Sequence, residues 1–205
     1  LVGAAGGTID MSAGGRIVVN TGELRLANSA KTNWTGNEGA LTVMSGATLN
    51  LWDSGIAPTA GQANTHVTVD GLDGGGTITR TQLVSGQTNP YASVLTVGVA
   101  GGSGQFDGVI ANASGTVSLE KVGAGTQALA GNNTFSGATT ISGGTLQIGA
   151  GGATGSFGNG TVLNNASLVF NRAANASAIT VQDLTGNGDL TVLQSGGLNF
   201  GVLSQ

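Results

Sequence analysis

Two carboxylates in a glycine-rich segment are the side chains of this sequence best suited to hold a metal ion. Asp70 and Asp73 lie in residues 70–76, which read DGLDGGG. Carboxylate oxygens are ligands that Ca²⁺ prefers, but the segment lacks the repeated aspartate spacing of calcium-binding nonapeptide arrays. We therefore interpret both aspartates as solvated turn residues, and we predict no metal site and no cofactor.

Carboxylates could also cleave a polysaccharide. Glycoside hydrolysis uses two of them about 5–9.5 Å apart, and Asp53 precedes Asp70 and Asp73 by 17 and 20 residues. Arg80 is the one basic residue near them in the sequence. His66 is the sole histidine, and no nucleophile-elbow motif accompanies it. We predict no catalytic residue, and a carbohydrate-active enzyme is kept as the alternative.

Three aromatic residues are candidates for contact with a partner. Trp34 lies in a polar segment, and Trp52 and Tyr91 lie at the edges of two irregular segments, 53–66 and 84–93. An exposed aromatic ring can stack on a sugar or anchor a protein. The alternative is that these rings only cover the core. Contact with a partner or glycan at Trp34, Trp52 and Tyr91 is therefore a hypothesis.

A short strand motif must position all of these side chains. Glycine, any residue, an aliphatic residue, any residue and another aliphatic residue follow one another at 7–11, 15–19, 22–26, 39–43, 115–119 and 144–148. Each copy predicts a turn followed by an alternating strand, because side chains two residues apart share one face of a strand. Such short strands must stack in many copies to bury a core.

The spacing of aliphatic residues predicts how the strands stack. Leu146, Leu168 and Leu190 are 22 residues apart, and so are Ile141 and Leu163. About three short strands and three turns fit into this period, which is one rung of a parallel β-helix. The sequence therefore predicts an all-β solenoid of about nine rungs over residues 1–205. The phenylalanines are expected in its core, where their rings could stack: Phe106, Phe135, Phe157, Phe170 and Phe200.

Composition excludes several other classes. The chain has 39 glycines in 205 residues and only 8% charged residues. The six basic residues are scattered, so we predict no nucleic-acid partner. No apolar stretch approaches the roughly 20 residues of a membrane-spanning helix. The sequence starts at Leu1 without the features of a signal peptide, so we expect a segment of a longer mature protein.

Residues 104–148 resemble the passenger-associated transport repeat of bacterial autotransporters. The ordered pieces that carry the resemblance are FDGVI at 106–110, LEKVG at 119–123, GT at 125–126, NTFSG at 133–137, TTI at 139–141 and GGTL at 143–146. Ala128 and Ala130 stand where hydroxyl residues are common, and Asn132 replaces a more usual alanine. These differences keep the strand and turn character of the motif.

The resemblance implies a setting that the residues alone do not supply. Passengers of this type, which include AIDA- and antigen-43-like adhesins, are right-handed β-helices exported through a C-terminal outer-membrane β-barrel of the same polypeptide. The repeat is linked to passenger export and folding. We therefore expect a non-enzymatic segment at the bacterial cell surface, acting in display, adhesion or self-association, with a role in virulence. Its partner would be a second copy or a host-surface protein or glycan. A passive stalk for an upstream domain is the other alternative.

Overall fold

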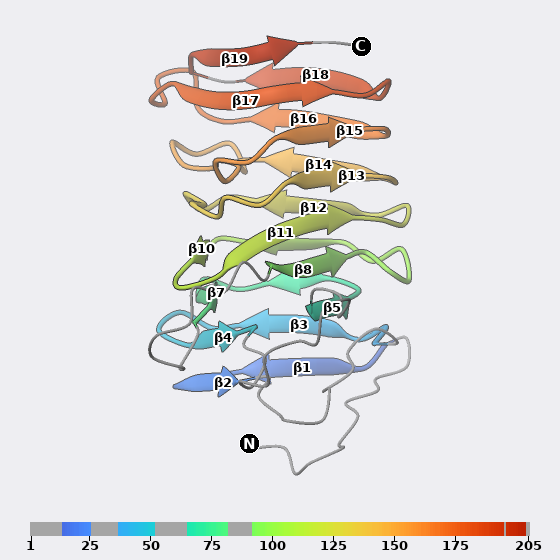
Figure 1. Ribbon diagram of the computed structural model, residues 1–205, viewed down its shortest axis with the longest axis vertical. Helices are drawn as coiled ribbons and strands as arrows, with labels where there is room; N and C mark the ends of the chain where they lie inside the picture. Colours follow the sequence, from blue (N-terminus) through green and yellow to red (C-terminus); the bar gives the residue numbers. More distant parts are fainter. Residues whose placement is uncertain (1–13, 26–36, 52–64, 82–91, 195, 204–205) are drawn as a thin grey trace, which may run out of the picture.

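Parallel strands stacked in columns make up the described part of the molecule. The computed structural model describes residues 14–25, 37–51, 65–81, 92–194 and 196–203. The chain coils around one axis, and each strand lies beside the strand of the previous rung, in the same direction (Figure 1). This confirms the predicted parallel β-helix. The described residues contain no helix long and apolar enough to cross a membrane.

The strands form three columns along the rod. The first column starts with the sheet β1 (Arg16–Val19), β3 (Ala40–Val43) and β6 (Leu72–Asp73) and continues in the sheet β9 (Gly104–Phe106), β12 (Thr126–Leu129), β14 (Thr145–Ile148), β16 (Ser167–Asn171) and β18 (Asp189–Gln194). The second column is one sheet of β5 (Thr65–Val69), β8 (Ala92–Val97), β11 (Thr116–Lys121), β13 (Thr139–Ile141), β15 (Val162–Asn164), β17 (Ile179–Thr185) and β19 (Leu198–Leu203). The third column holds β2 (Glu23–Arg25), β4 (Thr48–Asn50), β7 (Thr77–Arg80) and β10 (Val109–Asn112).

The number of residues per rung varies along the rod. Thr145, Ser167 and Asp189 are paired neighbours at the predicted spacing of 22 residues. Thr126 and Thr145 pair across only 19 residues, whereas Gly74 and Phe106 pair across 32. The predicted irregular segments 53–66 and 84–93 lie mostly outside the described residues. Their last residues are strand instead, because β5 starts at Thr65 and β8 at Ala92.

One predicted row of core residues is confirmed and the other is wrong. Leu146, Leu168 and Leu190 lie in register on β14, β16 and β18. Ile141, however, pairs with Asn164, and Leu163 has 39% of its surface exposed. This rung is one residue longer than 22, and a shift of one residue turns a strand side chain to the opposite face.

The outward orientation of Leu163 leads to a prediction about stability. Leu163→Thr should change the free energy of unfolding by no more than about 0.5 kcal/mol, because the leucine contributes little buried apolar area. Denaturant unfolding of the variant and the parent protein measures this difference. A loss well above 1 kcal/mol would show that Leu163 is packed in the core, as its spacing in the sequence first suggested.

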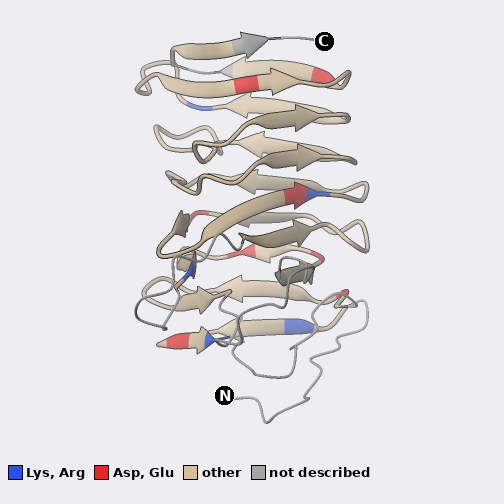
Figure 2. Ribbon diagram, in the orientation of Figure 1, with Lys and Arg blue, Asp and Glu red and all other residues tan. Residues whose placement is uncertain are grey.

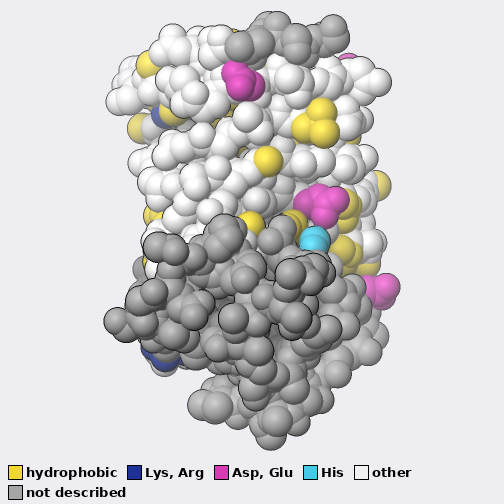
Figure 3. Space-filling model, viewed as in Figure 1, with side chains coloured by type: hydrophobic (Ala, Val, Ile, Leu, Met, Phe, Trp, Pro, Cys, Tyr) yellow, Lys and Arg dark blue, Asp and Glu magenta, His cyan; other side chains and the backbone are white. Residues whose placement is uncertain are grey.

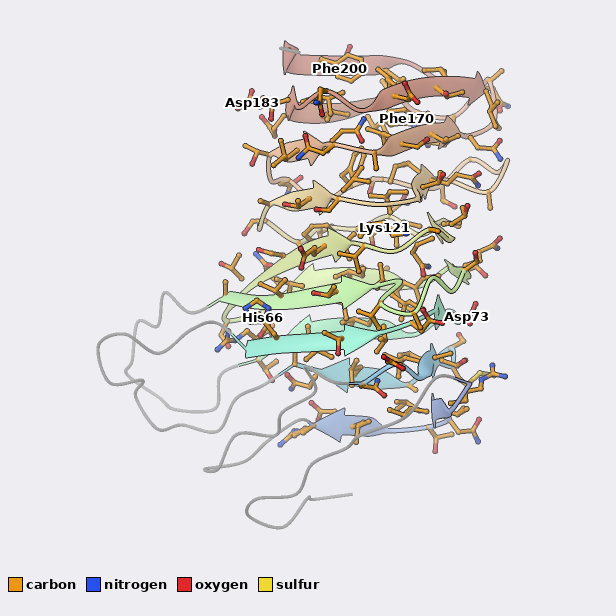
Figure 4. All side chains as sticks on the ribbon, turned by 90° about the vertical axis from the view of Figure 1, so that its right-hand side faces the viewer. His66, Asp73, Lys121, Phe170, Asp183 and Phe200 are labelled. Carbon is orange, nitrogen blue, oxygen red and sulfur yellow. The ribbon has the colours of Figure 1, made fainter. Side chains whose placement is uncertain are left out.

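Aliphatic and aromatic side chains fill the space between the columns. Phe106, Phe135, Phe157 and Phe170 are buried, as predicted, and Phe200 is partly buried. The rings of Phe157 and Phe170 meet edge to face, with their centroids 5.8 Å apart. Among the described residues this edge-to-face pair is the ring contact observed, whereas the sequence analysis expected the phenylalanine rings to form a stack. Figure 4 shows the inward side chains following the axis of the rod.

Candidate functional site

Asp70 and Asp73 bind backbone groups of the next rung. Oδ1 of Asp70 accepts hydrogen bonds from the amides of Ala100 (2.8 Å) and Gly102 (2.7 Å). Oδ1 of Asp73 accepts one from the amide of Gln105 at 3.0 Å. Both carboxylates thus tie neighbouring rungs together, Asp70 from the turn after β5 and Asp73 from the end of strand β6, where the sequence had predicted a turn. In the described ranges, no three histidine, aspartate or glutamate side chains are grouped as metal ligands.

The residues that an enzyme would need do not form one cluster in the described structure. His66 is exposed on β5, and Figure 4 places it on the opposite side of the rod from Asp73. Arg80 is buried and donates a hydrogen bond from Nη1 to Oγ of Ser93 at 3.2 Å. Asp53 lies outside the described residues. The described geometry therefore offers no observation in favour of the hydrolase alternative.

Trp34, Trp52 and Tyr91 all lie outside the described residues. Their contact with a partner therefore stays a hypothesis from the sequence.

Charge is sparse on the described surface. Residues 122–171 contain no charged side chain, and Figure 2 shows this part of the rod without blue or red. On the face in Figure 3, uncoloured backbone and polar side chains predominate in the described upper part, and an acidic group beside the histidine lies next to several hydrophobic ones. The exposed large hydrophobic side chains include Val192 and Leu193 on β18. The described surface thus has little electrostatic repulsion toward a similar surface.

A buried lysine interrupts an otherwise aliphatic row. Val69, Val97, Lys121 and Ile141 lie in register on consecutive strands of the second column. All four side chains have 0% of their surface exposed. Lys121 is the last residue of β11, so its ammonium group can reach the turn that follows while its alkyl chain packs in the core.

Three backbone carbonyls bind the Lys121 ammonium group. Nζ donates to the carbonyl oxygens of Val122 (2.6 Å), Gly123 (3.0 Å) and Gly143 (3.1 Å). Gly143 belongs to the turn of the next rung, so the lysine links two successive turns. An ammonium group has three N–H donors, and here each has an acceptor. The site is a saturated structural cation site inside the rod.

Burial lowers the pKa of Lys121, and the nearby Asp70 carboxylate partly opposes this shift. Because the folded pKa lies below the unfolded one, the unfolded chain binds more protons between the two values. The unfolding free energy should therefore rise with pH between the lowered pKa and about 10.4. Denaturant midpoints measured across this range should show the rise relative to Lys121→Met, which lacks the titrating group. Parallel pH profiles of the two proteins would contradict this prediction.

Gln127 carries a second polar group in the core. Its side chain is 1% exposed and lies in β12, two strands away from β6 along the first column. Its Oε1 accepts a hydrogen bond from the Leu72 amide at 3.1 Å. Its Nε2 donates to the carbonyl of Leu72 at 2.8 Å and to that of Ala128 at 3.1 Å. The amide thus connects two rungs that are not direct neighbours.

Arg172 is buried with fewer partners. Its side chain is 2% exposed and directly follows β16. Nη2 donates to the carbonyl of Ala153 at 3.2 Å. Nε and Nη1 have no hydrogen-bond partner among the described residues. Burial lowers the pKa of this guanidinium.

Sequence reasoning missed Lys121, Gln127 and Arg172 as buried polar residues. A signal existed for the first two. Lys121 follows Val117 and Leu119 at the spacing of an inward face, and Gln127 precedes the buried Leu129 by two residues. Charged and amide side chains are normally assigned to the surface. The inward positions of the alternating strand pattern were therefore not predicted to include Lys121 and Gln127.

These features define the class of structure: a low-charge parallel β-helix whose buried polar side chains join its rungs. Residues 119–148 match the family model of the passenger-associated-transport-repeat. This match supports an autotransporter passenger domain, and the repeat family is not an enzymatic one. It implies a secreted or surface-exposed protein. No curated protein and no solved structure matches the chain.

Proposed function

We propose that this chain is a non-enzymatic segment of a bacterial autotransporter passenger, exported through the outer membrane by a β-barrel of the same polypeptide. It acts at the cell surface in display and in adhesion or self-association. Residues 104–148 support folding and export of the passenger. The observation that carries the proposal is the transport-repeat match at 119–148 within a parallel β-helix.

The chemistry of the described residues supports a structural role for the repeat. Lys121 and Gln127, both inside the matched segment, bind backbone groups of other rungs rather than facing solvent. Side chains used in this way stabilise the stack and leave the outer face free. The sparse charge of that face favours close approach of a second copy or of a host-surface protein or glycan.

Deletion of single rungs in register tests the export role. Thr126 pairs with Thr145, so removal of residues 126–144 takes one rung out of the repeat and keeps the strand register. Ser167 pairs with Asp189, so removal of residues 167–188 is the matched control outside the repeat. In the complete autotransporter, the first deletion should reduce the amount of passenger on the cell surface much more than the second. Equal amounts would contradict an export role for the repeat.

Adhesion is tested on the same cells. Clumping and attachment to host cells are compared between bacteria that display the complete passenger and bacteria that lack this chain, at equal amounts of surface protein. A loss of clumping supports self-association, and a loss of attachment alone supports a host partner. No change in either would identify the chain as a passive stalk.

A further inference from the structure

The first column of strands is interrupted between β6 and β9. The two strands belong to different sheets, and Gly74 and Phe106 form the isolated bridge between them. Gly71 turns its carbonyl toward β3, where it accepts the amide of Leu41 at 2.8 Å. Successive residues of a parallel strand direct their amide and carbonyl groups to opposite neighbours. The amide and carbonyl of Leu72 therefore face the interruption, in a residue that is 0% exposed.

Gln127 supplies the hydrogen bonds that a neighbouring strand would make. Its amide offers one acceptor to the Leu72 N–H and one donor to the Leu72 carbonyl. Without this pair, two buried backbone groups would lack their partners in the first column, and buried backbone groups are nearly always paired. One side chain thus replaces a missing segment of the strand ladder.

Gly104 allows Gln127 to reach so far. It pairs directly with Gln127 on the adjacent strand, so it lies between Gln127 and Leu72. Neighbouring strands are about 4.8 Å apart, which puts two rungs roughly 10 Å from each other. A Cβ atom on Gly104 would lie 2.4 Å from the carbonyl oxygen of Leu72 and 3.0 Å from Oε1 of Gln127. Only a residue without a side chain leaves room for the bridge.

We infer that the Gln127 bridge couples the transport-repeat segment to the rungs that precede it. Leu72 lies 55 residues before Gln127, so its amide and carbonyl gain their partners only when the repeat has docked. The Leu72 backbone groups then owe their protection from solvent to a residue of the repeat. This inference rests on the proposed role of the repeat in passenger folding and names the contact through which it acts on the N-terminal rungs.

Hydrogen exchange of the Leu72 amide in the purified chain tests the bridge. Gln127→Leu keeps the approximate size of the side chain and removes both hydrogen bonds to Leu72, so exchange at the Leu72 amide should become about 30-fold faster. Gln147→Leu is the matched control, because the Gln147 amide donates to the Gly149 carbonyl at 2.8 Å on its own rung. The control should leave Leu72 unchanged. Equal exchange at Leu72 in Gln127→Leu and in the parent protein would overturn the inference.

A second variant keeps the test decisive if Gln127→Leu does not fold. Gln127→Asn retains the amide and shortens the side chain by one methylene, so it should also expose the Leu72 amide to exchange. Protected Leu72 in this variant would overturn the bridge. The amount of Gln127→Leu passenger on the cell surface separates the two proposals. Faster exchange at Leu72 with normal export supports the bridge and contradicts a role of the bridge in export. Loss of export in the 126–144 deletion with unchanged exchange in both point variants supports the repeat and contradicts the bridge.

Discussion

Replacing Lys121 by methionine should lower the unfolding free energy by about 2 kcal/mol. The alkyl part of methionine can still pack in the aliphatic row of Val69, Val97 and Ile141. The three carbonyl groups that share the ammonium, however, lose their common donor. They belong to half-buried turns, where water can replace only part of what is lost. The net effect is therefore destabilising although a buried charge is removed.

Denaturant unfolding of the purified variant measures the effect of Lys121→Met. Hydrogen exchange in the turn around Gly143 gives a local readout, because that turn is bound through the lysine. A variant as stable as the parent, with unchanged exchange in this turn, would mean that the ammonium contributes no net stabilisation. An increase in stability would mean that the cost of burying the charge exceeds the gain from its three hydrogen bonds.

The same substitution at Arg172 should act in the opposite direction. Arg172→Met is expected to raise the unfolding free energy by about 2 kcal/mol, because a buried charge with few partners costs more in desolvation than it regains. Nη2 has one carbonyl acceptor, at Ala153, and no described residue accepts a bond from Nε or Nη1. Methionine keeps apolar contacts of the arginine alkyl chain and leaves a single carbonyl without its donor.

The comparison of both methionine variants in one denaturation series is the sharpest form of the test. Arg172→Lys is the control, since it retains a charge in the same environment and should not share the gain in stability. If Arg172→Met were destabilising, the guanidinium would have to make further favourable interactions in solution. If both methionine variants shifted the unfolding free energy in the same direction, the number of hydrogen-bond acceptors would not determine whether a buried cation stabilises this rod.

Local sequence patterns predicted the fold because this fold repeats a local unit. Glycine followed by two alternating aliphatic residues specifies a turn and a short strand, and equal spacing specifies stacking. Leu146, Leu168 and Leu190 are in register for that reason. Ile141 and Leu163 are not, since one additional residue in a turn shifts the register, and spacing in the sequence does not reveal where such a residue is accommodated.

The candidate sites were less predictable than the fold. Asp70 follows β5 as a turn residue, as predicted, whereas Asp73 ends the strand β6, and the backbone partners of both lie on the next rung, about 30 residues away. Trp34, Trp52 and Tyr91 stay predictions, because they lie outside the described residues. Buried polar residues escaped notice because the hydrophobic pattern assigns them to the surface.

The sequence by itself determined the parallel β-helix, its glycine turns and the resemblance to the transport repeat. Each of these depends on residues close together in the chain or on a regular period. Only the tertiary structure decided that Lys121 joins two turns and that Gln127 reaches past Gly104 to Leu72. The reason is physical: hydrogen bonds between rungs depend on the register and on the space left by intervening residues, and both are set only when the rungs are stacked.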